Sequence, residues 1–380
     1  MRGIPSLITD IRKKVFTEVA RMAYSGDYTD MEDIPFKIVP GQSPLHRESV
    51  FLERAIAGER VRLAMGLSLQ PVQTRTLLTE GMDQAAIAEQ YYEPPLVNII
   101  PYACHACPTK QYRVTELCQG CLASSCQRVC PKGAVKFVNG KSRIDQKLCI
   151  KCGKCAKSCP YNAITYLERP CQAACGMDAI GVDEYGKACI DYDRCVSCGQ
   201  CIVNCPTGAI YEKDDTAKVL EAINDPEKFV VVHTAPSIRV TLGECFGMHI
   251  GTNVQGKMVA ALRRLGFDKV FDTNFGADLT IMEEGTEFLD RLQHGGVLPM
   301  ITSCSPGWVK YCEHYFPDMT ENLSSCKSPQ QMFGALYKTY FAKKMGIDPK
   351  DIVFVSAIPC TAKKFEVGRP GQDVDGMPGV

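Results

Sequence analysis

CIKCGKCAKSCP, residues 149–160, decides how the middle of this chain folds. Four cysteines stand at the spacing C-x2-C-x2-C-x3-C, and a proline follows the last of them. In this pattern three thiolates on a tight loop bind one [4Fe–4S] cube, while the fourth cysteine leads away and ligates the neighbouring cube. A zinc site needs only two C-x2-C pairs and leaves the third and fourth cysteines without a role. The stretch therefore predicts half of a two-cluster ferredoxin-type module.

The same motif recurs on both sides of this stretch. CVSCGQCIVNCP (195–206) repeats it, and CQGCLASSCQRVCP (118–131) repeats it with two extra residues before the third cysteine. Each copy is followed by a Gly-Ala-Val, Asn-Ala-Ile or Gly-Ala-Ile segment that predicts a short strand. The exchange of the fourth cysteine then gives the first module two cubes, one on Cys118, Cys121, Cys126 and Cys159 and one on Cys149, Cys152, Cys155 and Cys130.

The second module has an incomplete N-terminal half. CQAACGMDAI (171–180) keeps two cysteines of the motif but lacks the leading C-x2-C pair. The exchange rule assigns a third cube to Cys175, Cys195, Cys198 and Cys201, and it leaves half of a further site on Cys171 and Cys205.

A C-x2-C pair far upstream can complete that half-site. Cys104 and Cys107, in YACHACP, have no partners in the intact motifs, and we interpret them as the missing ligands of a fourth cluster. The alternatives are a free pair, or a different metal bound with His105. Cys189 is left over, and we expect a small buried residue there.

Composition favours metal over disulfides. The chain of 380 residues has 22 cysteines, and MRGIPSLITDIRKK has no apolar core typical of a secretion signal. The reducing cytoplasm keeps cysteines as thiols and metal ligands, so we expect a cytoplasmic protein. The net charge is zero and no apolar run approaches the ~20 residues of a membrane span, which argues against nucleic acid and membrane partners.

The flanking regions contain few cysteines and differ from each other. Apolar residues at Leu7, Ile11, Val15, Val19 and Met22 predict a helix that stops at Gly26, and a loop at 34–44 precedes a second helix from Glu48. In the C-terminal region, predicted strands at 229–235, 269–275, 297–303 and 351–357 alternate with helices at 256–266 and 279–292.

The expected fold class is therefore α+β and multidomain. We expect a helical N-terminal region at 1–100, tandem ferredoxin-like 4Fe–4S modules at 101–215, and an α/β domain at 216–380. Ligands of such α/β sheets sit at the carboxyl ends of the strands. TSCSPGW (302–308) and IPCTAKKFE (358–366) both follow predicted strands, so Cys304 and Cys360 are expected to converge.

Five stretches of the third region resemble, in order and spacing, the H-cluster domain of [FeFe]-hydrogenases. They are TAPSIRVTLGE, FDTNFGADLTIMEE, TSCSPGW, NLSSCKSPQQ and IPCTAKKFE. The resemblance implies a ferredoxin-type hydrogenase that reversibly reduces protons to H2, with electrons passing from ferredoxin or a similar low-potential carrier through three or four [4Fe–4S] clusters. It also implies an H-cluster, in which a [4Fe–4S] cube is bridged to a diiron centre with CO, cyanide and azadithiolate, and maturation proteins that build the diiron site.

The resemblance assigns roles to the matching residues. Cys360 matches a ligand of the cube, and Lys363 matches a lysine that hydrogen-bonds an iron-bound cyanide. Cys304 matches the cysteine that passes protons to the azadithiolate nitrogen. The diiron pocket matches Pro236, Ser237 and Gln330, and the proton relay to solvent matches Glu284, Ser324, Glu287 and Arg291.

The chain departs from the family pattern beside Cys304. The family usually has a second cysteine where this chain has Ser305. Either Ser305 ligates iron through its oxygen, or Cys304 becomes the ligand, or another thiol such as Cys326 replaces it. Ile358 also stands where the family usually has methionine, which alters the surroundings of the site. With these differences, the chain resembles a divergent, group B-like branch of the [FeFe]-hydrogenase family.

The family's third motif, which carries two more cysteines, would come after these stretches and is not in the sequence. We therefore expect a truncated version of a longer anaerobic enzyme, inactive as it stands. Two other functions stay open: a non-catalytic H2 sensor or iron–sulfur assembly factor, and a 4Fe–4S electron-transfer subunit. Cys304 argues against the first, since such relatives tend to lose it, and Lys363 with the relay residues argues against the second.

Overall fold

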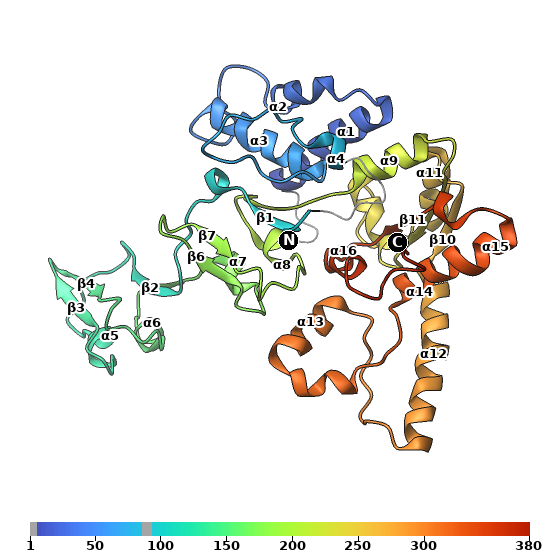
Figure 1. Cartoon of the computed structure of the whole chain (residues 1–380). Coiled ribbons are helices and arrows are strands. Elements are labelled where there is room, and N and C mark those ends of the chain that lie inside the picture. The colour runs from blue at the N-terminus through green and yellow to red at the C-terminus, as the bar shows by residue number, and fades with distance from the viewer. Residues whose placement is uncertain (1–5, 86–92) are drawn as a thin grey trace.

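The computed structural model describes residues 6–85 and 93–380. Figure 1 shows a helical lobe in blue at the top, ferredoxin-type modules extending to the left in cyan and green, and a domain in yellow to red on the right. None of the helices within these residues is long and apolar enough to cross a membrane.

The N-terminal lobe packs its helices around one apolar core. The helix α1 (Leu7–Ser25) begins at Ser6, whose Oγ accepts a hydrogen bond from the Ile8 amide, and it ends at Gly26 with φ 67°, as predicted. The other elements of the lobe are η1 (Thr29–Asp33), α2 (Ile34–Ile38), α3 (Val50–Ala64) and α4 (Met82–Ala85). The predicted loop at 34–44 therefore contains a short helix. Val15, Val19 and Val61 lie fully buried at the centre of the lobe.

The two ferredoxin-type modules are nested, not arranged in tandem. β1 (Val97–Ile99) pairs with β8 (Ile210–Glu212), and β2 (Gln111–Val114) pairs with β5 (Ile164–Leu167), both antiparallel. The second pair lies in sequence between the strands of the first. An inner module at 111–167 is thus inserted into an outer module, and it separates Cys104 and Cys107 from the rest of the outer module. This corrects the expected tandem order.

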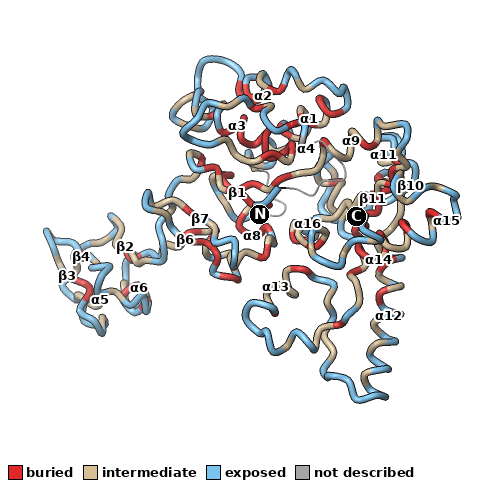
Figure 2. Tube along the Cα trace, in the orientation of Figure 1, coloured by how far each residue is buried: buried red, intermediate tan, exposed pale blue. Residues whose placement is uncertain are grey.

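Each module repeats the same small elements. The inner module contains α5 (Ser125–Arg128), β3 (Val135–Val138), β4 (Lys141–Ile144) and α6 (Lys154–Lys157). The outer module contains α7 (Pro170–Ala173), β6 (Ile180–Val182), β7 (Ala188–Ile190) and α8 (Gln200–Asn204). Cys189 is exposed and not buried as expected, because the alternation of β7 turns its neighbour Ala188 inward instead. Figure 2 shows that exposed residues predominate in the inner module.

The C-terminal domain is built on a three-stranded parallel sheet of order β10-β9-β11. The central strand β9 (Phe229–Thr234) is flanked by β10 (Lys269–Asp272) and β11 (Ile352–Ala357). Val230, Val231 and Val232 are each at most 1% exposed, which places the domain core on this strand. Its helices are α9 (Thr216–Asn224), α10 (Ile238–Thr241), α11 (Gln255–Leu265), α12 (Thr273–His294), α13 (Pro306–Tyr315), α14 (Pro329–Leu336), α15 (Ala342–Met345) and α16 (Ala362–Val367).

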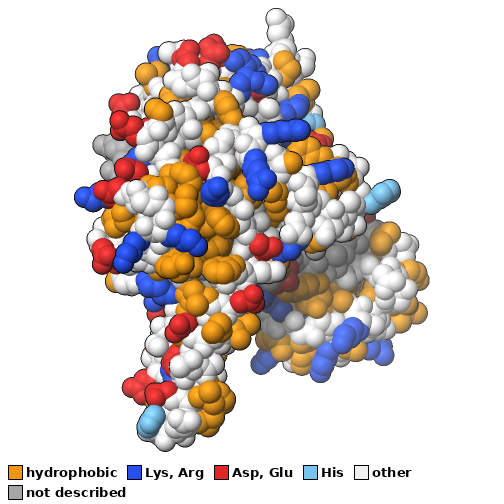
Figure 3. Space-filling view, turned by 90° about the vertical axis from the view of Figure 1, so that its right-hand side faces the viewer, with side chains coloured by type: hydrophobic (Ala, Val, Ile, Leu, Met, Phe, Trp, Pro, Cys, Tyr) orange, Lys and Arg blue, Asp and Glu red, His pale blue; other side chains and the backbone are white. Residues whose placement is uncertain are grey.

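Two predicted strands of this domain differ in the structure. The segment 297–303 makes only an isolated bridge between Ile301 and Leu323, since Pro299 has no amide hydrogen to donate to a neighbouring strand. The strand predicted at 269–275 ends at Asp272, whose carboxylate accepts a hydrogen bond from the Asn274 amide and so begins α12. Figure 3 shows hydrophobic side chains gathered on the face turned toward the viewer, and α12 itself exposes Ile281, Met282 and Leu289.

Candidate functional site

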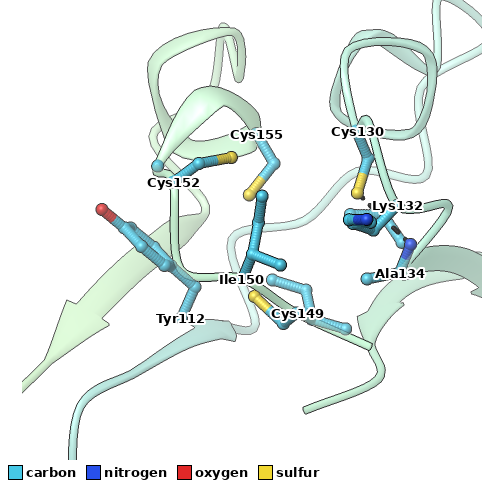
Figure 4. A pocket seen from close by; sticks show the side chains of 11 residues that line it. Tyr112, Cys130, Lys132, Ala134, Cys149, Ile150, Cys152 and Cys155 are labelled. Carbon is cyan, nitrogen blue, oxygen red and sulfur yellow. Dashed lines mark hydrogen bonds between the residues drawn. The ribbon is translucent and has the colours of Figure 1, made fainter. Parts of the chain in front are cut away.

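The inner module brings one predicted cluster set around a single pocket. Cys130 from the first motif and Cys149, Cys152 and Cys155 from the second line it, with Tyr112 and Ile150 as apolar walls. Figure 4 shows the sulfur atoms of Cys130, Cys149 and Cys155 turned toward the middle. This is the set that the exchange rule predicts.

The other set of the inner module gathers around Ser142. The Ser142 amide donates to the Cys118 sulfur over 3.5 Å, and the Ser142 hydroxyl lies 3.3 Å from the Cys126 sulfur. Cys159 packs in the same apolar cluster as Cys126. Cys121 lies on the same loop, three residues after Cys118 and four residues before α5 begins at Ser125.

The outer module forms a second pocket lined by cysteines from three separate segments. Cys104 and Cys107 precede the inserted module, while Cys171 and Cys205 follow it, and all four line this pocket. The four are the ones that sequence reasoning assigned to a fourth cluster. Cys104 and Cys107 are far in sequence from Cys171 and Cys205, because the inserted module lies between them.

The remaining set of the outer module also converges. Cys175 and Cys195 pack together against Met177 and Val196. Burial, together with the nearby sulfurs of Cys195, Cys198 and Cys175, raises the pKa of the Cys201 thiol to about 12. Ligation by iron therefore has to displace a firmly held proton from this thiol.

The loops of the four cysteine sets share one backbone geometry. The last cysteine of each motif accepts a hydrogen bond from the amide four residues later; the pairs are Cys130 with Ala134 (3.2 Å), Cys159 with Ala163 (3.4 Å), Cys175 with Ala179 (3.3 Å) and Cys205 with Ala209 (3.4 Å). Burial alone would raise the pKa of Cys130, yet amide donors from this turn lower it. Such donors favour thiolates, which are the ligands of iron–sulfur clusters.

The pair Cys104 and Cys107 shares a second feature with the intact motifs. Ala106, just before Cys107, has φ 47°. The residues in the same place before Cys121, Cys152 and Cys198 have φ 59°, 58° and 55°; they are Gly120, Lys151 and Ser197. A left-handed conformation is uncommon for alanine, lysine and serine, so its recurrence marks one loop type. This shared backbone conformation groups Cys104 and Cys107 with the intact motifs, and it could not be read from the residue types alone.

These residues fit a four-iron cluster better than a single ion. In 6–85 and 93–380, no group of three or more His, Cys, Asp and Glu side chains lies close enough to hold one metal ion. The cysteines instead surround open pockets, as expected when four thiolates bind different iron atoms of one cube. The donors are thiols supported by amides, which is the chemistry that an iron–sulfur cluster requires.

In the C-terminal domain, Lys363 connects the two predicted cysteine loops. Its ammonium group donates to the Cys304 carbonyl over 2.9 Å and forms an ion pair of 2.9 Å with Glu366. Glu366 in turn accepts a hydrogen bond from the Ser328 hydroxyl. Cys304 and Cys360 are both exposed, and Lys363 lies three residues beyond Cys360, so the two loops converge as expected.

The predicted pocket residues lie at the carboxyl end of β9 and on α14. Pro236 and Ser237 follow β9, and Gln330 is 2% exposed on α14. The Ser356 hydroxyl donates to Gln330 Oε1 over 2.8 Å and is hydrogen-bonded to His233 Nε2. Sequence reasoning missed His233, although a lone histidine within the apolar run FVVVHTA was visible. Burial, together with the positive charge of Lys363, lowers the pKa of His233 to about 4.

Three of the predicted relay residues form a continuous hydrogen-bonded chain. Arg291 Nη2 donates to Glu287 Oε1 over 2.6 Å, and the Ser324 hydroxyl donates to Glu287 Oε2 over 2.8 Å. Burial would raise the pKa of Glu287, but hydrogen bonds from Ser324, the Ser325 amide and Arg291 lower it to about 2. Glu287 is therefore a carboxylate that accepts protons only transiently at neutral pH.

The inner end of the relay is less connected. The Oε1 atom of Glu284 is buried and has no hydrogen-bond partner in the part of the chain that the structure describes. Cys326, offered as a substitute cube ligand, instead directs its thiol to Glu287 Oε2 at 3.5 Å. Ser305 stands at the start of α13 and is exposed.

The outer module docks on the C-terminal domain beside Cys360. The Thr361 hydroxyl donates to the Ser197 carbonyl over 2.5 Å, and Lys310 donates to the Cys195 carbonyl over 2.7 Å. Tyr315 adds a hydrogen bond to the Met177 carbonyl. The loop that carries Cys195 and Cys198 is thus fixed next to the loop that carries Cys360.

Both the cysteine-rich modules and the C-terminal domain are similar to known protein families. Residues 228–377 match the family described as "Iron only hydrogenase large subunit, C-terminal domain", and residues 110–160 and 148–209 match families described as "4Fe-4S dicluster domain". Iron hydrogenase 1 of Clostridium pasteurianum is 47% identical over 250 residues, which cover 65% of this chain and 43% of that protein.

Two further relatives show the range of similar proteins. The NADP-reducing hydrogenase subunit HndD of Solidesulfovibrio fructosivorans is 56% identical over 178 residues, 45% of this chain and 30% of that protein. The cytosolic Fe-S cluster assembly factor narfl of Danio rerio is 36% identical over 149 residues, 38% of this chain and 36% of that protein. The chain thus spans less than half the length of each of these relatives. The chain is therefore similar to iron-only hydrogenase large subunits over residues 228–377 and carries ferredoxin-type 4Fe–4S domains before them.

Proposed function

We propose that this protein is an [FeFe]-hydrogenase that reversibly reduces protons to H2. Electrons enter from ferredoxin or a similar low-potential carrier and pass through four [4Fe–4S] clusters held by the four cysteine sets. An H-cluster, when bound, supplies the metal centre at which electrons and protons combine. Cys360, with Cys304 or Ser305, contributes to its binding in this chain. The diiron part requires maturation proteins, and the many free thiols favour a cytoplasmic, anaerobic setting.

The observation that carries the proposal is the chain Arg291–Glu287–Ser324. A protein that only carries electrons or assembles clusters has no need for a proton route, whereas proton reduction consumes protons from solvent. Arg291 holds the Glu287 carboxylate in place, and the Ser324 hydroxyl both donates to that carboxylate and accepts from the Cys326 amide. In this proposal, protons pass along this hydrogen-bonded route and continue inward toward Glu284 and Cys304.

Lys363 and Gln330 have positioning roles in this proposal. Lys363 carries a positive charge between the Cys304 carbonyl and Glu366, and its side chain is 14% exposed. An ammonium group in that place suits an anionic ligand such as cyanide. The buried Gln330 amide is fixed by Ser356, so its remaining donor group is oriented before any cofactor binds.

The alternative is a non-catalytic iron–sulfur assembly factor or H2 sensor, favoured by the likeness to narfl and by Ser305. The test co-expresses the gene product that contains residues 1–380 with diiron maturation proteins. We expect iron-carbonyl infrared bands together with H2 evolution from a reduced low-potential dye. Carbonyl bands without turnover would support a sensor. A protein loaded with [4Fe–4S] clusters but without carbonyl bands would support an assembly factor or an electron-transfer subunit.

A further inference from the structure

Arg169 lies buried against the fourth cysteine pocket. It precedes α7, it is 2% exposed, and it lines the same pocket as Cys104, Cys107, Cys171 and Cys205. Its Nη2 atom donates to the Gly186 carbonyl over 2.8 Å. The Nε and Nη1 atoms are buried and have no hydrogen-bond partner among the residues that the structure describes.

Two guanidinium nitrogens without hydrogen-bond partners are costly inside a protein. A buried donor without an acceptor loses its hydrogen bonds to water, and a buried charge loses much more. Arginine also keeps its charge under all physiological conditions, so it cannot avoid this cost by losing a proton. The pocket that Arg169 lines offers mainly sulfur as an acceptor. The missing acceptor is therefore expected within the pocket itself.

We propose that Arg169 donates to a sulfide or cysteine sulfur of the fourth [4Fe–4S] cluster and raises its reduction potential above those of the other three. This inference rests on the proposed fourth cluster. A reduced cluster carries one more negative charge than the oxidised form, so a buried cation stabilises the reduced form more. Hydrogen bonds to the sulfurs act in the same direction.

The surroundings of this pocket differ from those of the matching pocket in the inner module. The buried Arg60 donates to the Gly208 carbonyl over 2.9 Å, near Cys205. Arg47 contacts His105 and donates to the Thr207 carbonyl over 2.8 Å. Both arginines come from the helical N-terminal lobe, so that lobe adds positive charge around the fourth site. The inner pocket has Lys132, which is exposed and therefore screened by water and salt.

The test is an anaerobic redox titration of the intact gene product, followed by electron paramagnetic resonance. Arg169→Gln keeps a donor but removes the charge. It should shift the equilibrium of one cluster toward the oxidised form by about tenfold or more, which is ~59 mV for a one-electron couple. The matched control Lys132→Gln should leave every midpoint potential unchanged. Unchanged potentials in Arg169→Gln, with full iron content, would overturn the inference.

A second variant separates this inference from the proposed cluster. Cys171→Ala combined with Cys205→Ala should remove the iron of one cube, and the signal that disappears should be the one with the highest potential in the unaltered protein. Loss of a lower-potential signal would refute the role of Arg169, even if Arg169→Gln fails to assemble. Unchanged iron content would instead refute the fourth cluster itself.

Discussion

The Thr361 hydroxyl lies 2.5 Å from the Ser197 carbonyl oxygen, to which it donates a hydrogen bond. Ser197 belongs to the loop between Cys195 and Cys198, and Thr361 directly follows Cys360. This one bond therefore joins the loop of Cys195 and Cys198 in the outer module to the Cys360 motif of the C-terminal domain. Under the proposed function, an electron that leaves the outer module would reach the C-terminal domain at this contact.

Removal of this hydroxyl should loosen the contact. Thr361→Val keeps the shape of the side chain but leaves the Ser197 carbonyl without its donor, so we expect the free energy of unfolding to fall by about 1–3 kcal/mol. Thr361→Ser retains the hydroxyl and serves as the control. Chemical denaturation of the cluster-loaded protein measures both. Equal stability of Thr361→Val and the unaltered protein would show that this bond does not hold the domains together.

Glu287 should be essential for proton transfer but not for cluster binding. Glu287→Gln cannot accept a proton, so we expect H2 evolution to fall by about 10²-fold or more while iron content and infrared bands stay the same. Glu283 lies on the same helix, is exposed, and provides the matched control Glu283→Gln. If both variants evolve H2 at the rate of the unaltered protein, protons take another path.

Cys326 should not be a ligand of the cube. Its thiol donates to Glu287 Oε2, which ties it to the proton relay. We therefore expect Cys326→Ala to retain its full iron content, while Cys360→Ala loses the iron of the cube. Iron analysis and electron paramagnetic resonance of the two variants decide this. Loss of iron in Cys326→Ala would instead assign it the place that Ser305 leaves open.

His233 should make the C-terminal domain sensitive to mild acid. Burial and the charge of Lys363 lower its pKa to about 4, whereas an unfolded histidine titrates near 6.5. As the pH falls from 7 to 5, the unfolded chain gains a proton that the folded chain does not, which costs about 2 kcal/mol of stability.

His233→Gln retains hydrogen-bonding groups and removes this titration. The difference in unfolding free energy between the variant and the unaltered protein, measured at pH 7 and at pH 5, isolates the contribution of the histidine from acid effects on the clusters. A difference that does not change with pH would mean that His233 has the same pKa in the folded protein as in the unfolded chain.

Local patterns predicted much of the fold. The helix at 7–25 with its glycine stop, the strands at 229–234 and 352–357, and the three intact cysteine motifs are all set by residues close in sequence. The nested order of the modules was not predicted, because it depends on the pairing of β1 with β8 across more than a hundred residues. The prediction of a strand at 297–303 was wrong for a local reason, since Pro299 has no amide hydrogen to donate to a neighbouring strand.

The candidate site divides in the same way. Spacing alone grouped Cys130 with Cys149, Cys152 and Cys155, which the structure brings around one pocket. Arg169 could not be assigned from sequence, because its importance lies in its burial and its missing partners. The environment of His233 likewise could not be predicted from the sequence. Its hydrogen-bond partners are Ser356, on the neighbouring strand β11, and Thr273, at the start of α12, and no local pattern connects them.

H2 evolution by the matured gene product that contains residues 1–380 tests the central claim most directly. The assay uses a reduced low-potential dye and compares the unaltered protein with Cys304→Ala and with Cys245→Ala, an exposed cysteine outside all the cysteine sets. We predict H2 from the unaltered protein and from Cys245→Ala, and a loss of about 10²-fold or more in Cys304→Ala. No H2 from a protein that shows iron-carbonyl bands, or equal H2 from Cys304→Ala, would contradict the account.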